Sequence, residues 1–282
     1  MQLCIFEDIK YANFEPLSLS RPVYELVCGI STLKEKILRN FPGRKYSLHC
    51  RSYLADTLRQ EFPKISVNEI DGDECLLING RLLSDKNLGR MFKLHDKKDR
   101  VYLYGDTVVA AKVSGGNLKK LKENLPDAIS KDSFFGLPFE NIETELVNYA
   151  WDLINSNGEE IAKDFKYLTA KNKNVKKKPK KKIHDGVHFV NKKNIYIGDG
   201  VEIKPGCVID ASKGPVYIDK NVFIFPNAVI EGPVYIGENS KIKSGATIYE
   251  NVSIGKVCKV GGEVEDMIMM PYSNKQHAGF IG

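Results

Sequence analysis

Two arginines and an aspartate are the first residues in this sequence whose types and positions suggest chemistry. Arg21 follows the segment Pro16–Ser20, and Arg81 follows the apolar run Cys75–Asn79. A guanidinium group binds phosphate oxygens in a bidentate geometry, so each arginine is a candidate phosphate ligand. For Arg21 a structural salt bridge is the alternative. Asp106 follows a further apolar run and could hold a metal ion, with a surface turn as its alternative role.

A second group of polar residues lies near the carboxyl terminus. It contains Tyr272, Asn274, Lys275 and His277. An imidazole has an unperturbed pKa near 6.5, which makes His277 a usable general base at neutral pH. The alternative is that His277 is a polar residue in a mobile tail.

Strand-like and helical stretches alternate over the first 170 residues. The expected strands are Leu3–Phe6, Ser47–Cys50, Cys75–Asn79, Val101–Tyr104 and Thr107–Val113. One expected helix begins with a capping box at Thr32 and Glu35 and ends at Arg39. A second begins with a cap at Ser52 and ends before Pro63. Two more are expected over Asn117–Leu125 and Ile142–Asn155. Such alternation predicts a Rossmann-like α/β domain with a mainly parallel sheet.

A six-residue period dominates the region from about Ile195 to Val260. The repeated positions are Ile197, Ile203, Ile209, Ile218, Ile224, Ile230, Ile236, Ile242, Ile248, Ile254 and Val260. The residue two places before each of them is small or aliphatic. The one slip in the period follows Ile209, where Ala211–Pro215 supplies three extra residues. A period of six fits neither a helix nor a simple strand.

Three short strands per coil explain this period. Each hexapeptide supplies one strand and one corner, and the aliphatic side chains stack inside a triangular prism. This predicts a left-handed parallel β-helix. Glycines and asparagines are expected at its tight turns, namely Gly198, Gly206, Gly237, Gly245, Gly255, Asn227 and Asn251.

A lysine-rich segment separates the two regions. The stretch from Lys171 to Lys182 contains eight lysines, and without them the formal net charge of +6 becomes about −2. The segment has no aromatic residue for stacking on bases, so a solvated linker is favoured over a nucleic-acid contact. We expect an α/β domain over residues 1–170, a linker over 171–183 and a β-helix domain over 184–282.

The cellular setting follows from absences in the sequence. No apolar run is long enough to span a membrane. The first residues meet acid at Glu7 and Asp8, which indicates a strand rather than a signal peptide. The six cysteines form no C-x-x-C pair, so free thiols in the cytoplasm are expected rather than a zinc site or disulfides.

Several motifs resemble a known family. Hexapeptide β-helices are similar to the acyltransferase superfamily, whose members usually form trimers. The segments Pro16–Leu26, Ile78–Arg81 and Trp151–Leu153 resemble the divergent bacterial branch of the bifunctional UDP-N-acetylglucosamine diphosphorylase / glucosamine-1-phosphate N-acetyltransferase family. The segments Gly261–Glu265 and Tyr272–Gly282 resemble its acetyltransferase part. The resemblance covers nearly the whole chain.

The resemblance implies an acetyl transfer at the carboxyl-terminal segment. His277 would take a proton from the amine of glucosamine 1-phosphate, and the amine would attack the thioester of acetyl-CoA. Lys275 and Tyr272 would contact the sugar phosphate, and Asn274 would help to orient it. The related enzymes continue for several coils beyond the point that corresponds to Gly282. The β-helix domain is therefore expected to be incomplete for this activity.

The resemblance also implies that the first domain transfers a nucleotidyl group from an NTP to a sugar 1-phosphate. UTP is the favoured donor and N-acetylglucosamine 1-phosphate an example of the acceptor, and the product would be a precursor of the cell wall. Arg21, Asn79, Arg81 and Asp152 would bind nucleotide or sugar phosphate, and Asp106 would hold Mg²⁺. The sequence departs from the family here. No glycine-rich loop follows the first strand, and Arg81 stands where an aspartate is usual.

Two other functions remain open at this stage. The protein could be an acyltransferase whose first domain only binds a sugar nucleotide, which the missing glycine loop favours. It could also be a non-catalytic trimeric sensor or scaffold.

Overall fold

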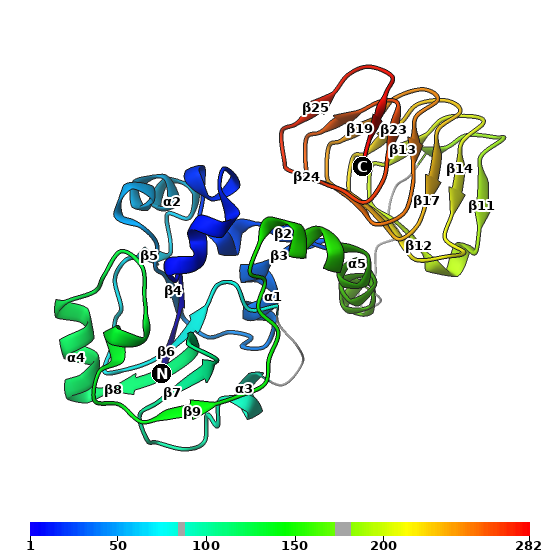
Figure 1. Cartoon of the computed structure of the whole chain (residues 1–282). Helices are drawn as coiled ribbons and strands as arrows, with labels where there is room; N and C mark the ends of the chain where they lie inside the picture. Colours follow the sequence, from blue (N-terminus) through cyan, green and yellow to red (C-terminus); the bar gives the residue numbers. More distant parts are fainter. Residues whose placement is uncertain (84–87, 173–181) are drawn as a thin grey trace. The chain divides into compact units, whose positions relative to one another are not determined.

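The computed structural model describes residues 1–83, 88–172 and 182–282, and the chain forms two compact units (Figure 1). The first unit contains Met1–Leu26 and Thr32–Ala150, and the second contains Val27–Ser31 and Trp151–Gly282. The first unit therefore ends earlier in the chain than the boundary expected at residue 170. The expected linker over 171–183 lies largely outside the described residues. None of the described helices has the length and apolar character that a membrane crossing requires.

A seven-stranded sheet forms the centre of the first unit, in the order β5-β4-β1-β6-β8-β7-β9. Its strands are β1 (Gln2–Phe6), β4 (Tyr46–Leu48), β5 (Ser66–Val67), β6 (Glu74–Asn79), β7 (Arg100–Tyr104), β8 (Thr107–Ser114) and β9 (Phe139–Asn141). Strand β8 is antiparallel to both of its neighbours, and every other neighbouring pair is parallel. This confirms the predicted α/β fold with a mainly parallel sheet. The sequence did not predict β5 and β9, because each contains only one apolar side chain and so shows no strand pattern.

The central strand β1 is buried on both faces. Leu3 and Ile5 pack in the core on one side of the sheet, and Cys4 and Phe6 pack in the core on the other side. A parallel strand that is covered on both faces has a continuous apolar sequence rather than an alternating one. The apolar run at the amino terminus therefore places β1 at the centre of the sheet. Glu7 and Asp8, which follow it, lie where the carboxyl ends of the parallel strands meet.

Short helices and turns cover the sheet. They are η1 (Ile9–Phe14), η2 (Leu17–Ser20), η3 (Val23–Glu25), α1 (Leu33–Arg39), η4 (Ser52–Leu54), α2 (Ala55–Glu61), α3 (Leu88–Met91), α4 (Gly115–Glu123) and η5 (Lys131–Phe134). The predicted capping box of α1 is confirmed. The Glu35 N–H donates to the Thr32 hydroxyl at 3.2 Å, and the Thr32 N–H donates to the Glu35 carboxylate at 2.9 Å.

One helix prediction is wrong in its cap and start, and another is wrong over the first part of its range. The Ser52 hydroxyl bonds to Asp127 at 3.1 Å rather than capping a helix, and α2 begins only at Ala55. The helix expected over Ile142–Asn155 is instead α5 (Ala150–Asn172). The residues before Ala150 are extended because the Val147 N–H donates to the carbonyl oxygen of Arg81 at 3.0 Å. The apolar residues between Ile142 and Ala150 therefore belong to an extended segment that pairs with Arg81 and Leu82, and not to a helix.

Three parallel sheets form the walls of the β-helix in the second unit. The first contains β10 (Lys182–Ile183), β13 (Glu202–Ile203), β16 (Phe223–Ile224), β19 (Lys241–Ile242), β22 (Lys259–Val260) and β25 (Asn274–Lys275). The second contains β11 (His188–Val190), β14 (Val208–Asp210), β17 (Val229–Glu231), β20 (Thr247–Ile248), β23 (Glu263–Val264) and β26 (Phe280–Ile281). The third contains β12 (Ile195–Ile197), β15 (Val216–Ile218), β18 (Val234–Ile236), β21 (Val252–Ile254) and β24 (Ile268–Met269). The remaining short elements are β2 (Val27–Cys28), β3 (Ser31–Thr32) and η6 (Lys192–Asn194).

The strand register confirms the left-handed β-helix predicted from the six-residue period. Val234 pairs with Val252, so one coil spans three hexapeptides. Ile195 pairs with Val216, and this longer coil contains the three extra residues near Ala211. The repeated isoleucines are buried inside the coils. Because each fully buried isoleucine contributes roughly 1.5–3 kcal/mol, the interior column is the main source of stability in this unit.

The glycines at the corners have two different roles. Gly206 and Gly245 have the positive φ of a tight turn, as expected, and so do Asn227 and Asn251. Gly237 is not among the positive-φ residues. A Cβ atom there would lie 2.6 Å from the Gly255 carbonyl carbon of the next coil. The expectation of a turn conformation is therefore wrong for Gly237, as it is for Gly198 and Gly255, where close contact between stacked backbones excludes a side chain.

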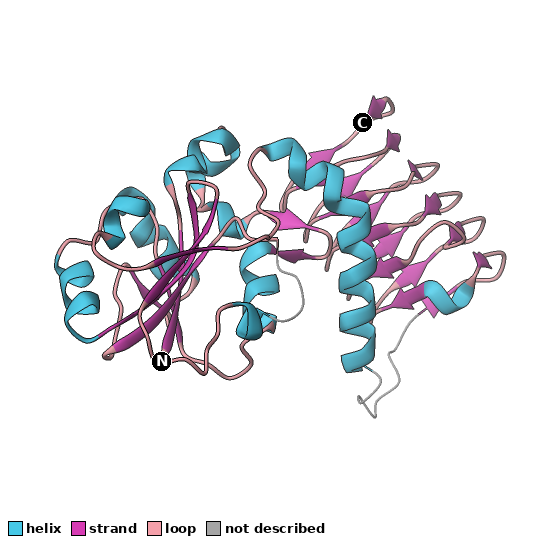
Figure 2. Ribbon diagram, turned by 60° about the horizontal axis from the view of Figure 1, so that its bottom comes forward, coloured by secondary structure: helices cyan, strands magenta, loops and turns pink. Residues whose placement is uncertain are grey.

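Helix α5 packs along the outside of the β-helix, beside the stacked strands in Figure 2. The rings of Tyr196, Tyr217 and Tyr235 form a ladder on this wall, and Phe165 of the helix contacts Tyr217 with 6.3 Å between ring centroids. The ladder ends at Ser253, which pairs with Tyr235 in the next coil. A small side chain there leaves room for the segment Val27–Ser31.

Asn157 of α5 joins that segment to the β-helix. Its Oδ1 accepts from the Gly29 N–H at 2.8 Å, and its Nδ2 donates to the Asn251 carbonyl oxygen at 2.7 Å. The Ser253 hydroxyl donates to the Gly29 carbonyl oxygen at 2.6 Å. Asn157 and Ser253 are almost completely buried. Buried polar groups need such partners, so this network fixes both the helix and the segment.

We predict that Asn157→Ala lowers the free energy of unfolding of the second unit by about 1–3 kcal/mol, because buried donors and acceptors lose their partners. Urea unfolding followed by circular dichroism measures the change. Asn155→Ala, at an exposed position of the same helix, is the matched control. Equal midpoints for the two variants would contradict the assigned role of Asn157.

Candidate functional site

Four strands of the first unit end at one edge of the sheet, which we call the carboxyl edge. Glu7 and Asp8 follow β1, His49–Arg51 follows β4, Gly80–Arg81 follows β6, and Asp106 lies in the turn after β7. The chain places β4 on one side of β1 and β6 on the other. Ligands of open parallel sheets bind where the strand order reverses in this way. The carboxyl edge beside β1 is therefore the candidate site.

Glu7 and Arg51 form a buried ion pair at this edge. Nε of Arg51 lies 3.1 Å from Oε2 of Glu7, and a terminal guanidinium nitrogen lies 3.2 Å from Oε1. Oε1 also accepts from the Val23 N–H at 2.9 Å. Burial raises the pKa of Glu7, and the hydrogen bonds and charge of Arg51 oppose that rise. The pair thus links the ends of β1 and β4 to the segment around Val23.

The remaining donors of Arg51 hold the loop that follows β1. One terminal nitrogen donates to the Ser18 carbonyl oxygen at 2.6 Å and lies 3.3 Å from the Arg21 carbonyl oxygen. The other donates to the Tyr53 hydroxyl at 2.6 Å. The guanidinium carbon also lies 4.1 Å from the centroid of the Tyr11 ring, a cation–π contact. All three guanidinium nitrogens of Arg51 therefore have acceptors within the protein.

Asp8 and Arg81 form a second buried ion pair on the other side of β1. Two nitrogens of Arg81 donate to the two carboxylate oxygens of Asp8, at 2.8 and 2.6 Å. The third donates to the Val147 carbonyl oxygen at 2.6 Å and to Asn148 at 3.0 Å. Nδ2 of Asn79 also donates to Asp8, at 2.9 Å. The structure thus gives Arg81 and Asn79 a positioning role, and ligand binding by either one stays a prediction.

His49 does not add a positive charge to this edge. Burial lowers its pKa, and its Nε2 lies 2.7 Å from the carbonyl oxygen of Pro126. The imidazole is therefore neutral at physiological pH and donates to that carbonyl.

Arg21 is held by its backbone rather than by its side chain. Its carbonyl oxygen faces Arg51, and the Val23 N–H two residues later is bonded to Glu7. Its side chain is partly exposed, and among the described residues it has no ion pair. Lys10, two residues beyond Asp8, is exposed as well. Arg21 and Lys10 are therefore accessible cations at the carboxyl edge. The carboxylates of Glu7 and Asp8 beside them are paired with arginines, so the edge suits binding of a phosphate group.

Comparison with known families decides how this edge is interpreted. A family model described as sugar nucleotidyl transferase matches residues 3–173, which is more than half of the chain. This chain belongs to the sugar nucleotidyl transferase family. A second family model, bacterial transferase hexapeptide (six repeats), matches residues 215–250. No curated protein matches the chain.

Mg²⁺ was the cofactor expected for such a transferase, and the described residues do not fit a protein-held cation. Arg51 and Arg81 occupy the oxygens of Glu7 and Asp8. Asp106 is fully exposed and lies 3.8 Å from the ammonium group of Lys131. Among the described residues no group of three His, Cys, Asp or Glu side chains could hold a metal ion. Metal binding by Asp106 stays a prediction without a second ligand.

The other predicted residues of this transferase lie in the second unit. Asp152 is half-buried on α5. Tyr272, Asn274 and His277 are exposed in the last coil. The ammonium group of Lys275 donates to the carbonyl oxygens of Gly261, His277 and Gly279, at 2.6, 3.1 and 2.7 Å. Lys275 therefore holds the backbone that carries His277.

The sequence prediction missed the residues that organise the carboxyl edge. Glu7, Asp8 and Arg51 were not among the candidates, although two consecutive acids directly after an apolar strand are a detectable signal. Their partners could not be identified, because Arg51 and Arg81 reach them only through the order of the strands. Of the predicted residues, the fold brings Arg21, Asn79, Arg81 and Asp106 to the same edge.

We predict that Arg51→Met lowers the free energy of unfolding by about 3–5 kcal/mol, because it leaves the Glu7 carboxylate buried without a counter-charge. The double variant Glu7→Gln with Arg51→Met should lose less, since no buried charge remains. Denaturant titration measures both. Arg59→Met is the control, because its pair with Asp56 is solvent-exposed and worth at most about 1 kcal/mol. Equal losses in the single and double variants would count against this pair.

Proposed function

We propose that the first unit transfers a nucleotidyl group from an NTP to a sugar 1-phosphate, with UTP and N-acetylglucosamine 1-phosphate as the substrates. Membership of the sugar nucleotidyl transferase family supports the class of reaction. The observation that carries the proposal is Arg21, whose carbonyl oxygen accepts from the buried Arg51 while its side chain is partly exposed at the carboxyl edge, without an ion pair among the described residues.

The reaction requires positioning and positive charge. An oxygen of the sugar phosphate attacks the α-phosphorus of the NTP, a new P–O bond forms, and the bond to the β-phosphate breaks. Pyrophosphate leaves with the bonding electron pair. Such transfers are accelerated mainly by alignment and by charge stabilisation. Arg21 would clamp the phosphates, and Lys10 would add positive charge beside them.

The two buried pairs would serve this reaction indirectly. Glu7 and Asp8 have guanidinium partners, so neither carboxylate is free to repel the triphosphate. Arg51 holds the Leu17–Ser20 turn through the Ser18 carbonyl oxygen, and the loop is thereby ordered before substrate arrives. Preorganised donors stabilise developing charge without paying a reorganisation cost during the reaction.

An acetyl transfer at the β-helix is the second candidate. The match to bacterial transferase hexapeptide repeats favours it, and so does the exposure of His277 in a backbone segment that Lys275 holds. His277 would act as the base for the amine of glucosamine 1-phosphate, with acetyl-CoA as the acyl donor, and Tyr272 and Asn274 would contact the sugar phosphate. A homotrimer built on the β-helix and a cytoplasmic location belong to this proposal. The six free, buried cysteines support the location.

We predict that the protein releases pyrophosphate from UTP in the presence of N-acetylglucosamine 1-phosphate and Mg²⁺, and that Arg21→Ala lowers kcat/KM roughly 100-fold through loss of a phosphate clamp. Arg44→Ala is the matched control, because Arg44 is exposed before the start of β4, at the opposite edge of the sheet. A coupled pyrophosphate assay provides the rates. Absence of release with several NTPs and sugar phosphates, or equal rates in both variants, would refute the proposal.

We predict for the second candidate that acetyl-CoA and glucosamine 1-phosphate yield free CoA, and that His277→Ala slows this at least about 100-fold through loss of the base. A thiol reagent measures the CoA. His188→Ala is the control, since His188 is an exposed histidine on the second strand of the β-helix. Identical rates would remove His277 as the base. Binding of UDP-sugars without turnover in either assay would favour the sensor or scaffold.

A further inference from the structure

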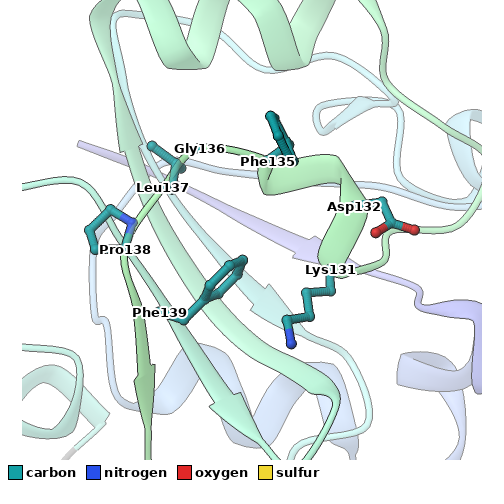
Figure 3. A pocket seen from close by; sticks show the side chains of 7 residues that line it. All are labelled: Lys131, Asp132, Phe135, Gly136, Leu137, Pro138 and Phe139. Atoms are coloured by element: carbon teal, nitrogen blue, oxygen red, sulfur yellow. The ribbon is translucent and has the colours of Figure 1, made fainter.

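An open pocket of about 620 Å³ lies on the first unit, and no predicted residue lines it (Figure 3). It is formed by the segment Lys131–Phe139, which contains η5 and the first residue of β9. The volume lies within the range of roughly 300–1,000 Å³ that is typical of small-molecule sites.

The pocket is held in shape by the core beneath it. Phe134 is buried among the apolar residues on this face of the sheet, and Leu137 packs against the same cluster. Gly136 has a φ of +85°, which turns the chain between these two anchors. The carbonyl oxygen of Pro138 accepts from the Val101 N–H at 3.0 Å, so the segment is also tied to β7. The walls are therefore preformed.

The side chains at the opening combine aromatic faces with a polar pair. Phe135 is 96% exposed and Phe139 is 44% exposed. Lys131 and Phe139 point toward each other in Figure 3, and the ammonium nitrogen lies 5.2 Å from the ring centroid. The same nitrogen lies 3.8 Å from a carboxylate oxygen of Asp106. The pocket thus offers aromatic surfaces and an ammonium donor, and the fully exposed Asp106 carboxylate lies beside its opening, outside the lining.

The pocket adjoins the carboxyl edge. The Ile129 N–H donates to the Glu7 carbonyl oxygen at 2.9 Å, and Ile129 forms an isolated parallel bridge with Asp8. Lys131 follows Ile129 by two residues, which span at most about 7 Å of extended chain. A small molecule that fills the pocket would therefore have one end near the residues that follow β1.

We infer that this pocket binds the pyranose ring of the sugar 1-phosphate, an inference that rests on the proposed nucleotidyl transfer. One face of a pyranose carries polarised C–H groups, which pack on the electron-rich face of an aromatic ring such as Phe139. Its rim carries hydroxyl groups, which accept from Lys131 in the lining and would donate to the Asp106 carboxylate beside the opening. The 1-phosphate would then point toward the residues that follow β1 at the carboxyl edge.

Direct binding tests this site without requiring catalysis. Saturation-transfer NMR and titration calorimetry with N-acetylglucosamine 1-phosphate, and separately with UTP, give the two affinities. Phe139→Leu keeps an apolar side chain but removes the ring, and Phe139→Tyr restores the ring. Phe135→Ala changes a side chain that is 96% exposed and is not needed for folding. Phe280→Ala, an exposed phenylalanine in the last coil, is the matched control.

The expected result is a roughly tenfold loss of sugar-phosphate affinity in Phe139→Leu and Phe135→Ala. Phe139→Tyr, Phe280→Ala and the affinity for UTP should remain unchanged. Loss of UTP affinity instead would overturn the inference and assign the pocket to the nucleobase. Unchanged sugar-phosphate affinity, or none in the native protein, would also overturn it. If sugar phosphate binds here but no pyrophosphate is released, the proposed reaction fails while the pocket assignment stands.

Discussion

Two consecutive carboxylates after the central strand set the main constraint on the first unit. Successive side chains of an extended chain point in opposite directions, so Glu7 and Asp8 diverge at the end of β1. Each is nearly buried, and an isolated buried charge costs several kcal/mol. Arg51 after β4 and Arg81 after β6 supply the counter-charges on the two sides. These two pairs join the ends of β1, β4 and β6, and Arg51 also holds the loop that carries Arg21.

The β-helix of the second unit has no such ion pair in its interior, among the described residues. Its interior is apolar, and its coils bond to each other through their backbones. Polar side chains are also buried where Val27–Ser31 and α5 pack on the outer wall, and there Asn157 and Ser253 pair with backbone groups. Asp164 accepts from the N–H groups of Ile30 and Ser31, at 2.9 and 3.1 Å. An amide, a carboxylate and a hydroxyl thus replace the aromatic ladder at the coil where the segment Val27–Ser31 packs.

The sequence predicted what depends on local repetition and missed what depends on strand order. Isoleucines at every sixth position identify the β-helix because each coil repeats the same burial. The strands β1, β6, β7 and β8 were predicted because their apolar runs are long. Arg51 follows a strand of three residues, and its partner lies 44 residues away in the sequence, so no local pattern shows the pair. The same reason explains why the helix prediction over Ile142–Asn155 failed, since distant pairing with Arg81 keeps its first half extended.

The nucleotidyl transferase region and the β-helix are not independent along the chain. The family match ends at residue 173 and therefore includes both Gly29 and Asn157. Their buried partners Asn251 and Ser253 lie beyond it. Separating the regions at the lysine-rich segment would break the bonds of the Asn157 Nδ2 and the Gly29 carbonyl oxygen to the β-helix, and each is worth about 0.5–1.5 kcal/mol net. The outer wall of the β-helix is thus covered by Val27–Ser31 and α5, which both lie within the transferase family match. This contact explains why α5 belongs to the family match although it packs on the β-helix.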